Sequence, residues 1–342
     1  MSAHSTLPGA ALPIIQAPMA GSQDSKLALA VAAAGGLGSI PCAMLSPAQI
    51  QAELAVLAAS GQAFNVNFFC HQMPAPDQAR LAAWQQALQP YYEEAGLAPA
   101  SGGATRMPFD ALALEALRAH PPAIVSFHFG LPAADLLAAV RALGCKVWAC
   151  ATTLAEGLWL QQQGVDAVIA QGVEAGGHRG MFLDMDLQTQ LGTFALTRLL
   201  AQHLHVPVIA AGGIVDHAGV RAALALGAVA AQVGSAYLLT PQANTSATHR
   251  AALHSAAAQE TALTTLFSGR PARGIVNRLM RELGPLNPLA PAFPLASAAL
   301  APLRAHAEKA GRGDFSPLWA GQAASLCRDM DAGDLTRMLA GV

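Results

Sequence analysis

The strongest constraint on the fold is an alternation between short apolar runs and amphipathic helical stretches that continues along most of the chain. Such runs, rich in apolar and β-branched residues, are typical of buried parallel strands. Three of the helical stretches end on a glycine, at Gly144, Gly164 and Gly227, directly before the next run. Glycine at this point allows the positive φ angle that ends a helix. We expect strands at residues 14–19, 38–42, 64–69, 123–129, 146–151, 167–171, 208–211 and 229–233.

Eight strands that alternate with helices predict an α/β chain folded as a (β/α)₈ TIM barrel. The length of 342 residues fits one such barrel, so we expect a single domain over residues 1–342. Two segments do not fit the repeat. Residues 71–108 insert at least one helix between the third and fourth strands, and residues from about 260 to 342 form a C-terminal helical extension. Because βα loops lie at the catalytic face, both segments are candidate lids.

Composition and charge argue against several kinds of partner. The net charge is −2, and no cluster of Lys and Arg forms the basic patch that a nucleic-acid-binding protein needs. The five cysteines lack metal-ligand spacing, so we predict free thiols in a reducing compartment and no metal site. Residues 1–13 do not resemble a signal peptide, and the uncharged stretch 27–45 contains glycines and a proline that argue against a membrane span. We expect a cytoplasmic protein, monomeric or homodimeric.

Glycines follow the last two expected strands, at the face where barrel enzymes bind their ligands. Gly212 and Gly213 follow the seventh strand, and Gln232, Gly234 and Ser235 stand at the end of the eighth. Glycine lets backbone N–H groups approach a phosphate closely, and this end of a barrel commonly binds one. The pattern indicates a phosphate site, while the alternative is that these glycines only form tight turns.

A glycine-rich loop with a histidine follows the sixth expected strand. Gln171 ends this strand, and Gly176, Gly177 and His178 lie within the sequence QGVEAGGHRG. Such a loop can fold tightly over a flat ligand. The imidazole can act as a general base or donate a hydrogen bond to an anionic substrate. A solvated loop histidine is the alternative.

Polar side chains on other expected strands are directed to the same mouth of the barrel. Alternation along the fourth strand places His128 so that it would point toward His178, unless it is a core histidine bonded to backbone. Asn65 and Asn67 share one face of the third strand, where a bound heterocycle or the backbone would satisfy their amides. Arg270 and Arg273 lie in a later loop that would either clamp an anion or form a salt-bridged surface turn.

A series of motifs, in the order found along the chain, resembles the class I nitronate monooxygenases, once called 2-nitropropane dioxygenases. The match runs from about residue 14 to residue 322. The related FMN-dependent enoyl-ACP reductases have a loop similar to EAGGHRG, whereas VSFHFG, FSGRPARG and LWAGQ point to the nitronate enzymes. The full set is QAPMAG, AGGLG, NVNFF, VSFHFG, AQGVEAGGHRG, AAGGI, QVGSAYLLT, FSGRPARG and LWAGQ.

The resemblance implies FMN bound non-covalently in the barrel mouth and oxidation of alkyl nitronates, such as propionate 3-nitronate, by molecular oxygen to a carbonyl compound and nitrite. His178 would bind the nitronate and, in relatives that accept neutral nitroalkanes, remove the α-proton, with His128 as its neighbour. The residues expected to contact FMN are Met19, Asn67, Gln171, Gly176, Gly177, Gly212, Gly213, Gln232, Gly234 and Ser235.

The chain departs from the family at the substrate pocket, which several tyrosines and a lysine commonly line. It has only three tyrosines, and Phe293 stands at one position where a tyrosine is expected. A substrate with a carboxylate would need another cation, for which Arg270 or Arg273 is a candidate. Two other functions stay open: an NAD(P)H-dependent reductase of quinones or enoyl thioesters on the same barrel, and a flavin-free barrel that binds a phosphorylated metabolite.

Overall fold

The computed structural model describes residues 7–75, 77–99 and 106–342, and its main body is a parallel barrel. The barrel strands are β1 (Ile14–Gln16), β2 (Gly38–Pro41), β3 (Phe64–Phe69), β4 (Ile124–His128), β5 (Lys146–Ala151), β6 (Ala167–Gln171), β8 (Val208–Ala211) and β9 (Ala230–Val233). They form an eight-stranded sheet in the order β1-β9-β8-β6-β5-β4-β3-β2. A parallel bridge between Ile15 and Leu37 joins its two edges. The predicted eight-stranded barrel is therefore confirmed.

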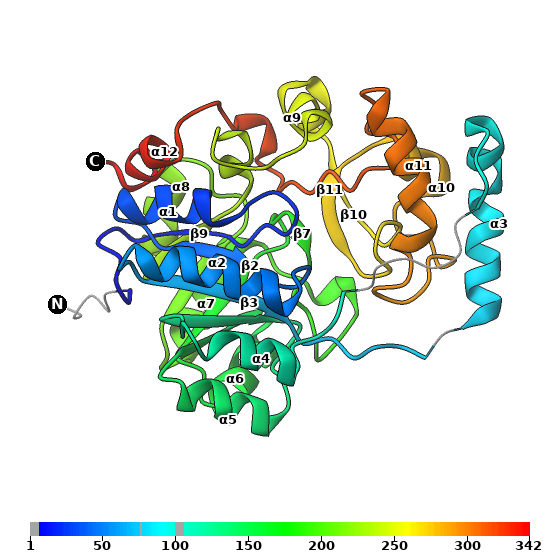
Figure 1. The fold of residues 1–342 in the computed structure, drawn as a ribbon. Helices are drawn as coiled ribbons and strands as arrows, with labels where there is room; N and C mark the ends of the chain where they lie inside the picture. Colours follow the sequence, from blue (N-terminus) through cyan, green and yellow to red (C-terminus); the bar gives the residue numbers. More distant parts are fainter. Residues whose placement is uncertain (1–6, 76, 100–105) are drawn as a thin grey trace.

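Helices surround the barrel, as Figure 1 shows. They are α1 (Ser25–Ala33), α2 (Pro47–Ala59), α4 (Ala111–Leu117), α5 (Ala134–Ala142), α6 (Leu154–Gln162), α7 (Thr193–His203), α8 (His217–Ala225) and α12 (Ala332–Ala340). The last of them, α12, packs against α1 and α8 and completes the ring. The predicted C-terminal extension thus returns to the barrel at its end. No helix within the described ranges is long and apolar enough to cross a membrane.

The ends of these elements agree closely with the local signals in the sequence. Ser46 caps α2 through a reciprocal capping box with Gln49, and Asp216 caps α8 by accepting a hydrogen bond from Gly219 N at 2.8 Å. The strand β1 is shorter than predicted and ends at Gln16. Pro18, which follows, has no N–H to continue a strand ladder.

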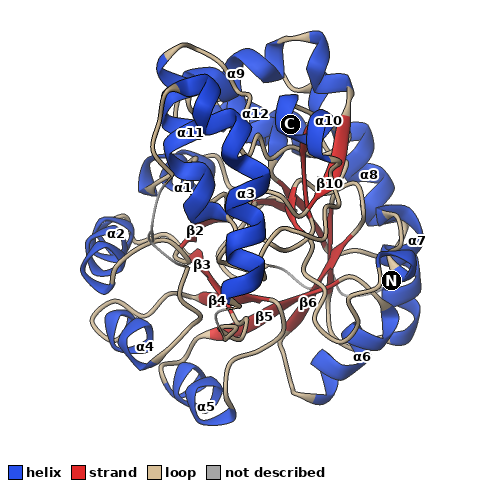
Figure 2. Cartoon of the chain, turned by 90° about the vertical axis from the view of Figure 1, so that its right-hand side faces the viewer, coloured by secondary structure: helices blue, strands red, loops and turns tan. Residues whose placement is uncertain are grey.

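The two segments outside the repeat combine into one smaller body, here called the second lobe. It consists of α3 (Gln78–Ala95) from the insertion, the hairpin β10 (Thr261–Thr264) and β11 (Ala272–Ile275), α10 (Arg278–Leu283) and α11 (Ser297–Lys309). Figures 1 and 2 both show α3 beside α11. Their shared core includes Trp84, Leu88, Tyr92, Leu279, Leu300 and Leu303. Part of the predicted insertion 71–108 lies outside the described residues.

A two-residue strand fastens the second lobe to the barrel. This strand, β7 (Gly177–His178), pairs antiparallel with β11, with His178 opposite Ala272 and Gly177 opposite Arg273. The remaining elements are α9 (Ala247–His254) and the short 3₁₀ helices η1 (Leu187–Thr189), η2 (Ser235–Leu239), η3 (Ala256–Gln259) and η4 (Ala324–Leu326). The sequence did not predict β7, β10 or β11.

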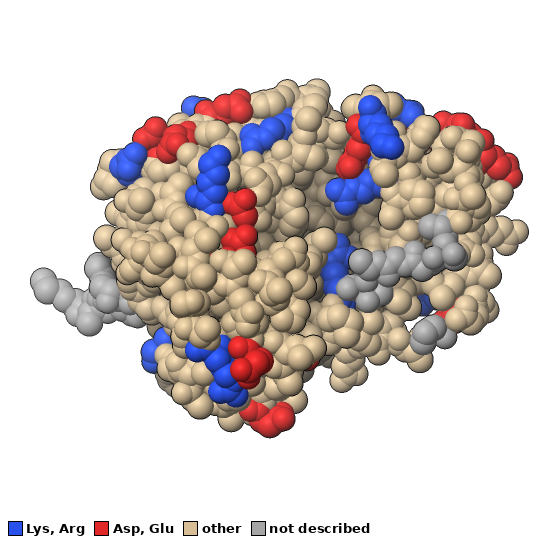
Figure 3. Space-filling view, viewed as in Figure 1, with Lys and Arg blue, Asp and Glu red and all other residues tan. Residues whose placement is uncertain are grey.

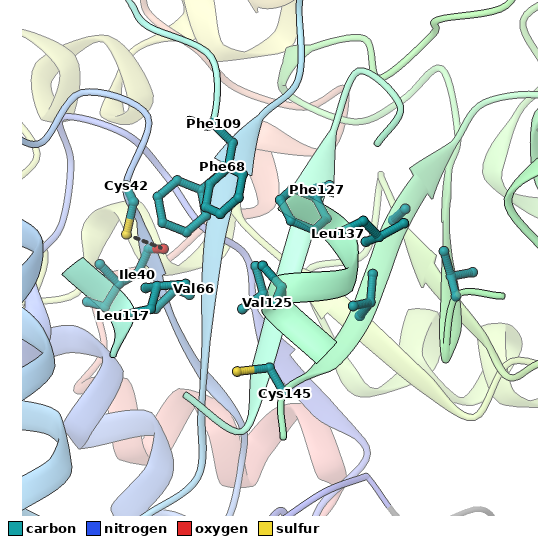
Figure 4. Packing of buried hydrophobic residues seen from close by; sticks show 14 of the residues in the cluster. Ile40, Cys42, Val66, Phe68, Phe109, Leu117, Val125, Phe127, Leu137 and Cys145 are labelled. Atoms are coloured by element: carbon teal, nitrogen blue, oxygen red, sulfur yellow. Dashed lines mark hydrogen bonds between the residues drawn. The ribbon is translucent and has the colours of Figure 1, made fainter. Parts of the chain in front are cut away.

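Apolar side chains fill the space on both sides of the barrel wall. Figure 4 shows Val66, Phe68, Val125 and Phe127, which alternate along β3 and β4 and pack in the layer between strands and helices. A separate cluster includes Ile124 of β4, Trp148 of β5, Ile169 of β6 and Ile209 of β8. Alternate positions of β3 carry amides instead: Asn65 Nδ2 donates to Ser39 Oγ at 3.1 Å, and Asn67 Nδ2 donates to Ser126 Oγ at 3.0 Å.

Replacing Trp84 with alanine should destabilise the protein by about 3–5 kcal/mol, because it leaves a cavity between α3 and α11. Trp84 is only 1% exposed, and its Nε1 donates to Ala296 O at 3.2 Å. Denaturant unfolding followed by circular dichroism measures the change. Leu112→Ala, at a side chain that is 66% exposed, is the control. A loss below 1 kcal/mol for Trp84→Ala would show that α3 does not depend on this core.

Candidate active site

A cavity of about 310 Å³ opens at the carboxyl ends of the barrel strands. Segments that follow the barrel strands form one part of its wall, and residues of the second lobe and of α9 form another. The structure brings every predicted site residue to this cavity, and what they bind stays a prediction. These residues are Met19, Asn67, His128, Gln171, Gly176, Gly177, His178, Gly212, Gly213, Gln232, Gly234 and Ser235.

His178 lies in this wall with one ring nitrogen held by the second lobe. Its Nε2 lies 2.9 Å from Ser268 Oγ, and that hydroxyl also lies 3.3 Å from the backbone oxygen of Arg270. Its Nδ1 has no hydrogen-bond partner among the described residues. Four aromatic rings surround the imidazole, with centroids 5.3–6.0 Å away: Phe69, Phe129, Phe293 and Trp319.

Burial keeps the imidazoles of the site neutral. It lowers the pKa of His178 well below the ordinary value, and the nearby positive charge of Arg106 lowers it further. Burial also lowers the pKa of His128 to about 3, although the hydrogen bond to the His178 backbone opposes this shift. In that bond, 3.1 Å long, His128 Nε2 donates to His178 O. His128 therefore positions the backbone that carries His178.

Two side chains fix the histidine loop against the end of β6: Gln171, the last residue of that strand, and Arg179, which lies in the loop itself. Gln171 Nε2 donates to His178 O at 2.9 Å, and Gln171 Oε1 accepts from Gly180 N at 2.8 Å. The buried guanidinium of Arg179 donates to the backbone oxygens of Gly172 and Gln171 at 2.6 and 2.7 Å. The side chain of Gln171 thus orders the histidine loop, and one amide N–H of Gln171 remains for a ligand.

The loop with Arg270 and Arg273 is not a salt-bridged surface turn, so that alternative from the sequence is wrong. Arg273 is 6% exposed and donates to Val173 O at 2.9 Å. Arg270 donates to Met181 O, and its Cζ lies 4.0 Å from the ring centroid of Phe129. Neither side chain lines the cavity in the described part of the chain. Their bonds to loop carbonyls and the Phe129 ring stabilise the wall instead.

Unpaired donors gather at the end of the cavity formed by β8 and β9. The backbone N–H groups of Gly176 and Gly213 donate no hydrogen bond to a described residue. Ser235 Oγ accepts from Gly321 N at 2.9 Å, which leaves the serine proton free to donate. A Cβ on Gly176 would lie 2.6 Å from the carbonyl carbon of Ala320, so only glycine fits there. This arrangement suits an anionic group such as a phosphate.

Other residues of the site were not predicted from the sequence as site residues. Ser268 and Trp319 lie in the motifs FSGRPARG and LWAGQ, so the sequence contained a signal for both. Arg106, Arg304 and His249 also line the cavity, but they lie outside every recognised motif. Arg106 and Arg304 come from segments that reach the cavity with the second lobe.

Acid should destabilise the protein through its buried histidines. Burial lowers the pKa of His249, which is 7% exposed, to about 4. Between pH 6.5 and 4 the unfolded chain therefore binds a proton that the folded chain does not, and stability falls as pH falls. At pH 5 the resulting loss in the free energy of unfolding is roughly 2 kcal/mol for one such histidine. Well above pH 6.5 His249 is neutral in both the folded and the unfolded chain, so its contribution to stability no longer depends on pH.

The comparison of His249→Gln with His203→Gln, at an exposed side chain, measures this effect. Urea unfolding at pH 7 and pH 5 should give a smaller loss of stability for His249→Gln than for the unsubstituted protein. His203→Gln should keep the full loss. Equal losses in all three proteins would exclude His249 as a source of the acid sensitivity.

Similarity to known proteins agrees with the motifs. The family model described as nitronate monooxygenase matches residues 3–340. A nitronate monooxygenase from Pseudomonas aeruginosa is 43% identical over 332 residues, which cover 96% of this chain and 95% of that protein. One from Paraburkholderia phytofirmans is also 43% identical, over 96% of this chain and 91% of its own.

Two solved structures resemble this chain to different degrees. A nitroalkane oxidase from Streptomyces ansochromogenes has a TM-score of 0.89 and 37% identity, covering 98% of this chain and 96% of its own. FabK from Thermotoga maritima shares the fold, with a TM-score of 0.70 and 24% identity over 96% and 91% of the two chains. The reductase alternative is not favoured, and the predicted family is confirmed. The chain is an enzyme that belongs to the nitronate monooxygenase family.

Proposed function

We propose that this enzyme oxidises alkyl nitronates such as propionate 3-nitronate with molecular oxygen, to a carbonyl compound and nitrite, and that it uses FMN bound in the cavity. The observation that carries the proposal is the position of His178. Its neutral imidazole lies among aromatic rings with no described partner for Nδ1, in a cavity that also holds backbone donors without a described acceptor. Membership of the nitronate monooxygenase family supports the reaction class.

The residues of the cavity fit FMN. The unpaired N–H groups of Gly176 and Gly213 and the hydroxyl of Ser235 would bind its phosphate. Gln232 Oε1 is buried without a partner in the described part of the chain and would accept a hydrogen bond from the ligand. Asn67 Nδ2 is held by Ser126, so its Oδ1 remains for the heterocycle. When bound, FMN supplies the electron-accepting chemistry of the reaction.

The chain's own task is to hold the nitronate and exclude water. A nitronate is already a stabilised carbanion, so its oxidation needs no strong base. The rings of Phe69, Phe293 and Trp319 beside His178 form an apolar wall. In such a wall a hydrogen bond from the imidazole to the anion is stronger than it would be in water.

Ser268 decides which nitrogen of His178 carries the proton. If its hydroxyl donates to His178 Nε2, the proton lies on Nδ1, which can donate to a nitronate oxygen. If the hydroxyl donates to Arg270 O, 3.3 Å away, Nε2 carries the proton and Nδ1 is a free base. The first arrangement binds a nitronate, and the second removes the α-proton of a neutral nitroalkane.

We further propose that the enzyme works in the cytoplasm as a monomer or homodimer. The five cysteines are free thiols, as expected in a reducing compartment.

The visible spectrum under anaerobic conditions tests the reaction and the cofactor together. The purified protein should show flavin absorption, and propionate 3-nitronate should bleach it, because electrons pass from the nitronate to the flavin. NADH should leave the spectrum unchanged. Bleaching by NADH and not by the nitronate would assign the protein to the reductases. A colourless protein that does not take up added FMN would favour a flavin-free barrel.

His178→Asn should lower kcat/KM for propionate 3-nitronate by about 10²–10⁴, the range typical of a residue in general acid–base catalysis. FMN should stay bound, because the groups assigned to its phosphate are the backbone N–H groups of Gly176 and Gly213 and the hydroxyl of Ser235, which the substitution leaves in place. Oxygen consumption measures the rate, and the flavin spectrum measures the bound cofactor. His203→Asn on the outer face of α7 is the control. Full activity of His178→Asn would remove His178 from the mechanism.

A further inference from the structure

Two arginines line the cavity on the side of the second lobe. Arg106 lies in the insertion that also contains α3, and Arg304 lies on α11. Figure 3 shows Lys and Arg side chains at the hollow near the middle of the molecule, between the barrel and the second lobe. Both arginines belong to the part of the chain that does not follow the barrel repeat, so the proposed FMN contacts on the barrel do not use them.

Arg106 has no anionic partner in the described part of the chain. Its guanidinium takes part in no ion pair or side-chain hydrogen bond with a described residue. Burial and the charge of Arg304 lower the pKa of Arg106. The backbone of Arg106 is held in place, since its oxygen lies 3.0 Å from His71 Nε2. A largely buried guanidinium without a counter-ion is costly, and an anion that reached it would relieve that cost.

Arg304 adds a second guanidinium, which is 46% exposed and is paired with the carboxylate of Glu308. Its Nε donates to Glu308 Oε1 at 2.8 Å, and Ser316 Oγ donates to the same oxygen at 2.7 Å. The terminal nitrogens of Arg304 make no hydrogen bond with a described residue. Glu308 also lines the cavity, so the charged side chains there are two guanidiniums and one carboxylate. This part of the cavity therefore carries excess positive charge.

Arg106 and His178 line the same cavity. Among the charged groups around His178, Arg106 opposes protonation of the imidazole most strongly. His71 links the two positions, because its ring lies 4.7 Å from Phe293, and Phe293 lies 5.3 Å from His178. A short substrate can thus have its nitronate group at His178 and a second anionic group at Arg106.

We propose that Arg106 and Arg304 bind the carboxylate of the substrate and make the enzyme prefer carboxylate-bearing nitronates over alkyl nitronates of similar size. This inference rests on the proposed function. Arg270 and Arg273, the candidates from the sequence, bind loop carbonyls and do not line the cavity. A guanidinium can form two parallel hydrogen bonds with a carboxylate, which selects both charge and shape.

The ratio of kcat/KM for propionate 3-nitronate to that for butane 1-nitronate tests the proposal. In Arg106→Gln the ratio should fall at least tenfold, as expected when a charged hydrogen bond of about 1.5–3 kcal/mol is lost. In Arg304→Gln it should fall by a smaller factor, and Arg106→Lys should restore part of the preference. Arg312→Gln, in an exposed ion pair with Asp314 on the same lobe, should leave the ratio unchanged. An unchanged ratio in Arg106→Gln, or equal loss on both substrates, would overturn the proposal.

Binding measured without turnover separates this proposal from the proposed function. Anaerobic calorimetry with 3-nitropropionate, which keeps the carboxylate but lacks the nitronate charge, should show a Kd at least tenfold higher in Arg106→Gln than in the unsubstituted enzyme. Arg312→Gln should not change it. If the unsubstituted enzyme oxidised neither nitronate, the proposed function would fail while calorimetry still tested the carboxylate site. Equal Kd values in Arg106→Gln and the unsubstituted enzyme would overturn the arginine proposal alone.

Discussion

The geometry of the site depends on the backbone oxygen of His178, which accepts hydrogen bonds from two barrel strands at once. His128 on β4 and Gln171 on β6 both donate to it. The same residue pairs with Ala272 on β11, so the second lobe fixes it from the opposite side. An imidazole on a glycine-rich loop would otherwise sample many positions. Here three separate segments of the chain define where its ring lies, which is the preorganisation that binding a small anion requires.

The barrel and the second lobe contribute different kinds of group to the cavity. The barrel supplies glycine N–H groups and amides, which are suited to a cofactor of fixed shape. The second lobe supplies Arg304 at the cavity wall and Ser268 as the hydrogen-bond partner of His178, and Arg106 reaches the cavity from the insertion that contains α3. Because the lobe is formed jointly by α3 and α11, the preference for a substrate can change through this lobe without altering the barrel. Insertions on barrel loops commonly vary in this way.

Much of the fold and of the cavity could be predicted from the sequence, because both follow from local rules. Short apolar runs and helix-ending glycines located all eight barrel strands, and the rule that ligands lie at strand ends located the predicted residues that line the cavity. The pairing of β7 with β11 could not be predicted, since a strand of two residues has no periodicity. The placement of Arg270 outside the cavity and of Arg106 inside it depends on long-range packing, which no local pattern encodes.

The position of α12 determines the order in which this chain can complete its fold during synthesis. The helix fills the gap between α1 and α8, where Leu335 and Leu339 share a core with Val31 of α1. Everything between β9 and α12, including most of the second lobe, is translated before that gap can close. The apolar face of α1 therefore stays partly uncovered until α12, which follows the second lobe along the chain, has been made. The ring of helices around the barrel is therefore completed only after the second lobe has been translated.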